Sequence, residues 1–296
     1  MNTIYRIPFL LLCLCLPFAG LAKKQRFDRT YFERYEVQSN AVVNVRSSFS
    51  ELNVQSVPGN TVTIEVRVEV DASNADKAQK LLDRLKVTIK GSRNEVSVTT
   101  DTGSEWNNKG ENFKIIVTVK APAGNQLDVD HQFGSATIGD FSGTAKLNSG
   151  FGSMTVGKLT GNDNTVKSSY GKTQINTAAS GNYQSEFGEL RIGALNGNAQ
   201  LRCSFGNLTV DLVNATVATL HVNNEFGETK LTLAANASFL VEAQSGFGDV
   251  DLPRDARIIS DKEAFTSRSI DAEIGQQSQN RLTITNSFGE VNVKRQ

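Results

Sequence analysis

An aromatic residue followed by glycine recurs along the second half of the chain, and its spacing constrains the fold more than any other feature. The aromatic residues of the eight pairs are Phe133, Phe151, Tyr170, Phe187, Phe205, Phe226, Phe247 and Phe288. Successive copies lie 17 to 21 residues apart, except that 41 residues, close to two periods, separate the last two. A fixed period of about 20 residues is typical of a solenoid, in which each repeat forms one coil.

Apolar and polar residues alternate on both sides of each pair. The positions three and five residues after the aromatic are mostly apolar, as at Leu190 and Ile192, and the position four residues before it is mostly apolar as well. Period-two alternation indicates a strand with one buried face. Glycine-rich pieces such as "GDFSGT" and "GKLTGN" separate the strands, so each coil is predicted to contain a strand, an aromatic-glycine corner, a second strand and a turn.

No coil can bury its apolar stripe alone. Stacking of the coils, with a spacing of roughly 4.8 Å between neighbouring coils, would bury it. We therefore predict a mainly β protein in which residues 123–296 form a parallel β-solenoid, or β-helix, of about eight coils of 17–21 residues. Glycine would supply a corner that a Cβ obstructs. We expect the aromatic residues to stack in an interior column, so that Phe187→Asp would bury a charge and unfold the neighbouring coils.

The preceding part of the chain, residues 23–122, is predicted to be a small β-rich unit with one helix. Residues 41–70, 95–100 and 113–122 alternate as strands do, and "SSFSELNV" at 47–54 resembles an isolated copy of the repeat. Residues 72–87 instead carry apolar residues at helical spacing after Ser73 or Asn74, either of which can cap a helix. Residues 23–39 match neither pattern.

The N-terminal residues 1–22 are typical of a signal peptide. Arg6 precedes an apolar run that is too short for a membrane span, and Gly20 and Ala22 occupy the −3 and −1 positions of a cleavage site. The chain is therefore predicted to be exported to the periplasm, the outer surface or the medium. No later apolar stretch approaches 18 residues, so no membrane span is expected in the mature chain.

Composition limits the chemistry that the mature chain can carry. Thirty-one basic and 31 acidic residues balance, which gives no indication of a nucleic-acid partner. Cys203 is the only cysteine after residue 22, so a cysteine-based metal site and an intramolecular disulfide are excluded.

A column of small polar residues lies two positions before each aromatic residue. This composition is expected of an internal hydrogen-bond ladder. The members of the column are His131, Ser149, Ser168, Ser185, Cys203, Asn224, Ser245 and Asn286. We expect Cys203 to be a buried small residue rather than a reactive thiol, and His131 to be structural or to face solvent.

No residue is predicted to be catalytic, to bind a cofactor or to bind a metal. An acidic residue follows the glycine in four coils, at Glu189, Glu228, Asp249 and Glu290, which makes calcium binding a hypothesis to consider. The other coils hold serine, lysine or asparagine at this position, so the pattern does not support it. The acids are scattered, so nothing selects the carboxylate pair that a polysaccharide-degrading enzyme needs. Residues 253–281 fill the 41-residue gap and are expected to project from the rod as a surface loop or a binding loop.

Two stretches, "KIIVTVKAPAGNQLDVDHQFGSATIGDFSGTAKLNSGFGSMTVGKLTG" and "SGFGDVDLPRDARI", resemble a bacterial family of exported proteins regarded as candidate adhesins. The resemblance covers roughly residues 113–296, and the N-terminal unit is expected to belong to it as well. It implies a secreted or envelope β-solenoid without known enzymatic activity, and no functional residues carry over.

We therefore predict a non-enzymatic, adhesin-like envelope or surface interaction protein without a cofactor, whose partner is an unknown envelope protein or glycan. Two alternatives stay open: a polysaccharide-binding or polysaccharide-degrading β-helix protein, and an envelope-stress signalling component, which the resemblance also allows.

Overall fold

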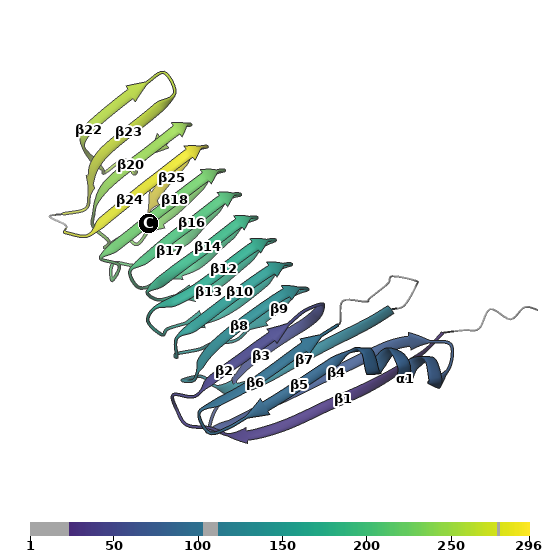
Figure 1. The fold of residues 1–296 in the computed structure, drawn as a ribbon. Coiled ribbons are helices and arrows are strands. Elements are labelled where there is room, and N and C mark those ends of the chain that lie inside the picture. The colour runs from purple at the N-terminus through teal and green to yellow at the C-terminus, as the bar shows by residue number, and fades with distance from the viewer. Residues whose placement is uncertain (1–23, 103–111, 277–278) are drawn as a thin grey trace, which may run out of the picture.

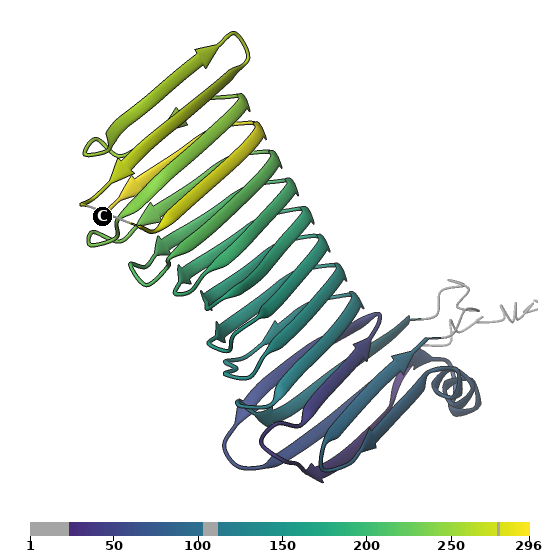
Figure 2. The same ribbon diagram turned by 60° about the vertical axis from the view of Figure 1, so that its left-hand side comes forward.

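The computed structural model describes residues 24–102, 112–276 and 279–296, and this part of the chain is mostly strand. The strands form two long sheets that face each other along a rod, and the N-terminal strands and helix project sideways at one end (Figures 1 and 2). The prediction of a mainly β, parallel solenoid is confirmed. The predicted signal peptide, residues 1–22, lies outside the described residues.

The first sheet has twelve strands. Its spatial order is β1 (Gln25–Glu36), β4 (Thr61–Ala72), β7 (Asn112–Pro122), β3 (Ser50–Val57), β9 (Ala136–Ile138), β11 (Met154–Leu159), β13 (Thr173–Ala178), β15 (Leu190–Leu195), β17 (Leu208–Val213), β19 (Thr229–Leu233), β25 (Val291–Arg295) and β21 (Val250–Asp251).

The second sheet has thirteen strands. Its spatial order is β22 (Arg257–Ala264), β23 (Ser267–Ile274), β20 (Phe239–Phe247), β24 (Arg281–Phe288), β18 (Thr219–Phe226), β16 (Ala199–Phe205), β14 (Gly181–Phe187), β12 (Asn164–Tyr170), β10 (Ala145–Phe151), β8 (Gln126–Phe133), β2 (Val42–Ser47), β6 (Glu95–Asp101) and β5 (Lys86–Gly91).

Equivalent residues of successive coils pair with each other, so each position of the repeat forms a column along the rod. Val156 of β11 pairs with Ile175 of β13, and Ile175 pairs with Ile192 of β15. All three side chains are fully buried between the sheets. The apolar columns predicted from the alternation are therefore the core of the rod, and removal of this surface from water is its main stabilising term.

The N-terminal strands are mainly antiparallel. Strand β4 pairs with β7 and with β1, which is formed by the stretch that matched no sequence pattern. The predicted helix is present as α1 (Ala75–Arg84), shorter at both ends than the expected 72–87. Asn74 caps it by accepting a hydrogen bond from the Lys77 backbone N–H at 2.9 Å.

Both sheets cross the expected domain boundary at residue 122 without interruption. Strand β2 pairs with β8 in one sheet, and β3 pairs with both β7 and β9 in the other. The fragment "SSFSELNV" spans the end of β2 and the beginning of β3, as the repeat does in later coils. The division into residues 23–122 and 123–296 stays a prediction, since the hydrogen-bonded sheets run through it.

The C-terminal coil does not follow the order of the sequence. Strand β24 lies between β18 and β20, and β25 lies between β19 and β21, so the last coil is inserted between the two coils that precede it. The 41-residue gap is therefore not two stacked periods.

The expectation that residues 253–281 project as a loop is wrong. They contain the antiparallel hairpin β22–β23, and β23 adds to β20 at the far end of the second sheet. Ile270, Ala272 and Ile274 of β23 are buried, which explains why the hairpin packs instead of projecting.

Candidate interaction surface

Nine aromatic rings stack in one unbroken row along the rod, which we call the aromatic ladder. In spatial order its members are Phe49, Phe133, Phe151, Tyr170, Phe187, Phe205, Phe226, Phe288 and Phe247. Neighbouring ring centroids lie 4.5 to 4.9 Å apart, and the ring planes differ by at most 9°. The spacing equals the distance between neighbouring strands because each coil contributes one ring. Phe288 stands between Phe226 and Phe247, which follows from the inserted coil.

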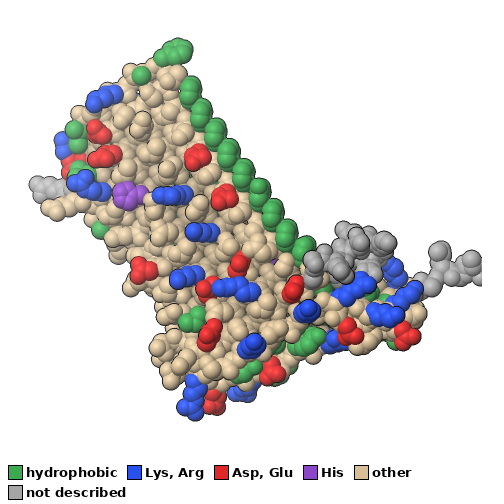
Figure 3. All heavy atoms as spheres, viewed as in Figure 1, with side chains coloured by type: hydrophobic (Ala, Val, Ile, Leu, Met, Phe, Trp, Pro, Cys, Tyr) green, Lys and Arg blue, Asp and Glu red, His purple; other side chains and the backbone are tan. Residues whose placement is uncertain are grey.

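The ladder lies on the outside of the rod, so the prediction of an interior column is wrong. The exposed fraction of its rings ranges from 37% at Phe133 to 58% at Phe247. Figure 3 shows a continuous line of hydrophobic side chains along one edge of the rod. The rings do stack as expected, but they stack in contact with water.

A bend in the backbone turns each ring outward. In the pairing of β10 with β12, Ser149 pairs with Ser168 and Phe151 pairs with Tyr170, whereas the residues between them are left out of the register. The chain bends there, so the buried side chain at the corner is the small polar residue and the ring points away from the core. Gly152 follows with a φ of 128°, and a Cβ built on it would lie 1.9 Å from the carbonyl oxygen of Gly134. Glycine is therefore required at the corner.

The polar column beneath the ladder is buried, but successive members do not form a hydrogen-bond ladder. Among the described residues, the bonds found run mainly to backbone carbonyls, as from Ser245 Oγ to Gly289 O at 2.9 Å and from Asn286 Nδ2 to Gly227 O at 3.2 Å. The hydroxyl groups of Ser149, Ser168 and Ser185 have no hydrogen-bond partner. The column therefore mainly provides side chains that are small enough to fit beneath the corner.

Cys203 and His131 occupy this column as expected. Burial raises the pKa of the Cys203 thiol to about 11, so it stays a protonated small side chain at neutral pH. His131 is fully buried, and its Nδ1 lies 2.8 Å from Ser47 Oγ. Burial lowers the pKa of His131, although the nearby Gly134 backbone and the charge of Asp130 act in the opposite direction. His131 is thus structural and does not face solvent.

Carboxylates border the ladder in the coils from Phe187 to the far end. Glu189, Glu228 and Asp249 form ion pairs with Lys172, Lys230 and Arg268, respectively. Glu186, Glu225 and Glu290 are exposed beside the ladder, and no ion pair is found for them among the described residues. Among all the residues that the structure describes, no group of three or more acidic, histidine or cysteine side chains could hold a metal ion.

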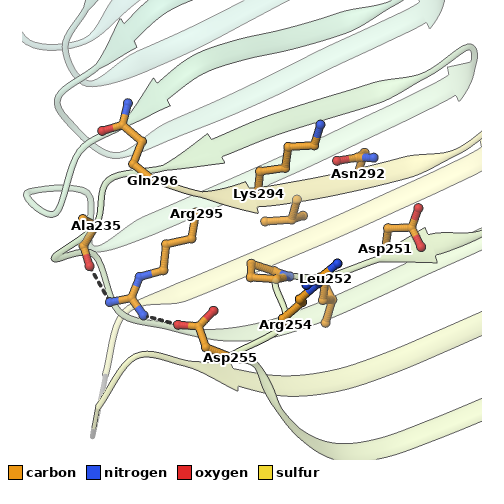
Figure 4. Close-up of a pocket in the computed structure, with 11 residues that line it drawn as sticks. Ala235, Asp251, Leu252, Arg254, Asp255, Asn292, Lys294, Arg295 and Gln296 are labelled. Atoms are coloured by element: carbon orange, nitrogen blue, oxygen red, sulfur yellow. Dashed lines mark hydrogen bonds and ion pairs between the residues drawn. The ribbon is translucent and has the colours of Figure 1, made fainter.

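A shallow cleft of about 730 Å³ lies at the far end of the first sheet (Figure 4). It forms because β21 ends at Asp251, shortly before Pro253, whereas the neighbouring β25 continues to Arg295. Its charged lining residues are Asp251, Arg254, Asp255, Lys294 and Arg295. Arg295 is already engaged with the Asp255 carboxylate and the Ala235 carbonyl. The cleft therefore offers mixed charges, and the ladder remains the larger uniform surface.

Residues 39–294 match the Toastrack DUF4097 family, which spans both the N-terminal strands and the solenoid. The chain belongs to this family. The Toastrack match begins before the first coil and includes the helix, so it covers the N-terminal unit from residue 39 onward, as the resemblance implied. No curated protein matches the chain.

Several solved structures are similar to this Toastrack chain at low identity. A candidate adhesin from Bacteroides fragilis is 11% identical, with a TM-score of 0.41, over 90% of this chain and 97% of that chain. A candidate lipid-binding protein from Parabacteroides distasonis is 9% identical, with a TM-score of 0.39, over 90% and 96%. A candidate adhesin from Parabacteroides distasonis is 14% identical, with a TM-score of 0.30, over 90% and 97%.

Within the described part of this Toastrack chain, no helix has the length and apolar character to cross a membrane. Sequence reasoning singled out the aromatic residues but placed them in the core, and it missed the ladder as a surface. No local signal could have found it, because neighbouring residues of a strand face opposite sides, so an acid such as Glu186 directly before Phe187 is also compatible with an inward ring.

Proposed function

We propose that this Toastrack protein is an exported, non-enzymatic, adhesin-like interaction protein of the cell envelope or surface. It acts by presenting the outer surface of its solenoid to an envelope protein or a glycan. The observation that carries the proposal is the aromatic ladder, a nine-ring apolar stripe in contact with water along the length of the rod. A soluble protein rarely leaves a contiguous apolar surface of this extent open unless something binds it.

A second feature that supports the proposal is the rigidity of the surface. The ladder rings are fixed by strands paired on both sides and by glycine corners with close backbone contacts. A partner would therefore meet side chains that lose little conformational freedom on binding, which lowers the entropic cost of association.

Residues 24–296 would be tested for binding to bacterial envelope fractions in a pull-down and to sugars on a glycan array. We expect saturable binding to at least one partner, and loss of that binding in F187S/F205S. Empty results from both experiments would contradict the function. Unchanged binding by F187S/F205S would place the binding surface elsewhere.

Export would be tested by N-terminal sequencing of the protein from the extracytoplasmic fraction. The signal peptide in residues 1–22 predicts a mature chain that begins at Lys23. Recovery of the intact chain in the cytoplasm would contradict the proposal.

A further inference from the structure

The geometry of the ladder determines which chemical groups can reach it. Because the rings stack face to face, each inner ring has both faces covered by its neighbours and presents only its edge to solvent, which is a C–H edge except at the hydroxyl of Tyr170. Sugars and nucleobases bind aromatic residues through the ring faces, and the terminal Phe247 is the ring with an outer face beyond the stack. Along its length the ladder is therefore an apolar line suited to aliphatic or aromatic side chains.

The borders of the ladder carry negative charge in its far half. Glu186 and Glu225 lie directly before Phe187 and Phe226 on the second sheet, and Glu290 lies two residues after Phe288 on the other side. Around Phe133 and Phe151 the corresponding border positions are uncharged: Gln132, Ser135, Gly150 and Ser153. Glu51, two residues after Phe49, is paired with Lys114. The three carboxylates would repel anionic lipid headgroups, and they would repel the same carboxylates of a second copy packed ladder to ladder.

The length and straightness of the stripe fit one kind of secondary structure. The six rings from Tyr170 to Phe247 span about 24 Å at one strand spacing per ring. An α-helix of about 16 residues covers this length, and the apolar stripe of an amphipathic helix matches a line of ring edges. Basic residues on both borders of that stripe would meet the carboxylates.

The geometry points to a partner protein that docks an amphipathic helix with basic borders along the last six rings of the ladder. This inference rests on the proposed function and names the chemistry of its partner. The apolar stripe of the helix lies on the rings from Tyr170 to Phe247, and its lysine or arginine side chains reach Glu186, Glu225 and Glu290.

The probe is a fluorescent 18-residue helix with a leucine stripe and lysine borders, and its matched control carries glutamate in place of lysine. Fluorescence anisotropy would be measured with residues 24–296. We expect the lysine helix to bind at least tenfold more tightly than the glutamate helix. Its affinity should fall about tenfold in E186Q/E225Q/E290Q and in F205S/F226S, and it should weaken with salt.

The matched control is E33Q/E36Q/E65Q, which removes the same net charge from exposed positions on β1 and β4, at the opposite end of the rod from the rings Tyr170 to Phe247. It should bind the lysine helix as the parent does, and circular dichroism melts would show that every variant is folded. Equal binding of the two helices, or an equal loss in this control, would overturn the inference.

Two further measurements identify the other possible occupants. Ladder-dependent binding to phosphatidylcholine vesicles, or ladder-dependent dimerisation in sedimentation, without binding of the lysine helix, would overturn the inference in favour of a lipid or a second copy. In those cases, loss of envelope or glycan binding in F187S/F205S would still support the proposed function. The two proposals can therefore fail separately.

Discussion

Seven of the eight glycines that follow a ladder ring are held by two separate constraints, a left-handed φ and a close backbone contact. Gly152 adopts a φ of 128°, which an L side chain rarely adopts, and its Cα faces the Gly134 carbonyl of the preceding coil. The same arrangement recurs at Gly171 and Gly206. Relief of one constraint therefore does not relieve the other.

Gly152→Ala is expected to lower the free energy of unfolding by about 3 kcal/mol or more, because the added Cβ meets a backbone carbonyl that cannot move freely. Gly124→Ala is the control, since a Cβ at Gly124 meets no atom within 4 Å. Urea unfolding of both variants would test this. Equal stabilities would show that the corner does not have the described backbone.

Phe187→Ser is expected to destabilise the protein by only about 1–2 kcal/mol, since the ring is half exposed and loses mainly its stacking contacts. Leu190→Ala, in the fully buried core three residues later, should cost about 2–5 kcal/mol. Thermal melts of the two variants would be compared. A larger loss for Phe187→Ser would support an interior ring.

Protonation of His131 is expected to destabilise the fold. Its pKa is lowered in the folded protein, so below about pH 6.5 the unfolded chain binds the proton more readily, and stability falls as pH falls. One proton contributes at most about 1.4 kcal/mol per pH unit. His131→Ser, which installs the residue of the next coil, should remove this part of the pH dependence. Urea unfolding between pH 7.5 and 5 would measure it, and parallel curves for both proteins would contradict it.

The side of the sheet on which the rings lie could not be obtained from alternation. The inward positions precede the aromatic by an even number of residues, as at Tyr183 and Ser185, and follow it by an odd number, as at Leu190 and Ile192. The parity therefore changes at the corner. Because the sequence does not show whether the ring stands before or after this change, both an inward and an outward ring satisfy the pattern.

At the level of the elements, the inserted coil places the C-terminal strands inside the sheets. Strand β24 has parallel partners on both sides, and β25 pairs with β19 along its length. The hairpin β22–β23 forms the end of the second sheet, with β22 as its edge. The strands at the end of the rod, β20 to β23, therefore precede the last coil in the sequence, and the last coil lies between them and the earlier coils.

Amide hydrogen exchange should reflect this order. Residues 281–288 are expected to exchange slowly because β24 is paired on both edges, whereas residues 257–264 of the edge strand β22 should exchange faster. Peptide-resolved mass spectrometry would measure both. Fast exchange in 281–288 would contradict the inserted position of the last coil.

Sequence periodicity identified the strands but not this connection. The spacing of 41 residues is compatible with two periods, and nothing local distinguishes a coil added at the end from one inserted a step earlier. The alternation of Ile270, Ala272 and Ile274 was a readable strand signal, but partner choice in a sheet depends on contacts between residues far apart in the chain.

At the scale of the whole molecule, repetition turns a local corner into a continuous surface. Each coil adds one ring, one glycine and one small polar residue, and the in-register sheets align them along the rod. The class of fold could be predicted because period and alternation are properties of the repeat itself. The surface could not, since it depends on which way each ring turns at the corner.

Hydroxyl-radical footprinting tests the exposed ladder most directly, because the oxidation rate of a phenylalanine follows its contact with water. Mass spectrometry would compare Phe151, Phe187 and Phe205 of the ladder with Phe141 and Phe239, which are buried in the core. We expect rapid oxidation of the three ladder rings and protection of the two core rings. Protection of the ladder rings to the level of Phe239 would contradict this expectation.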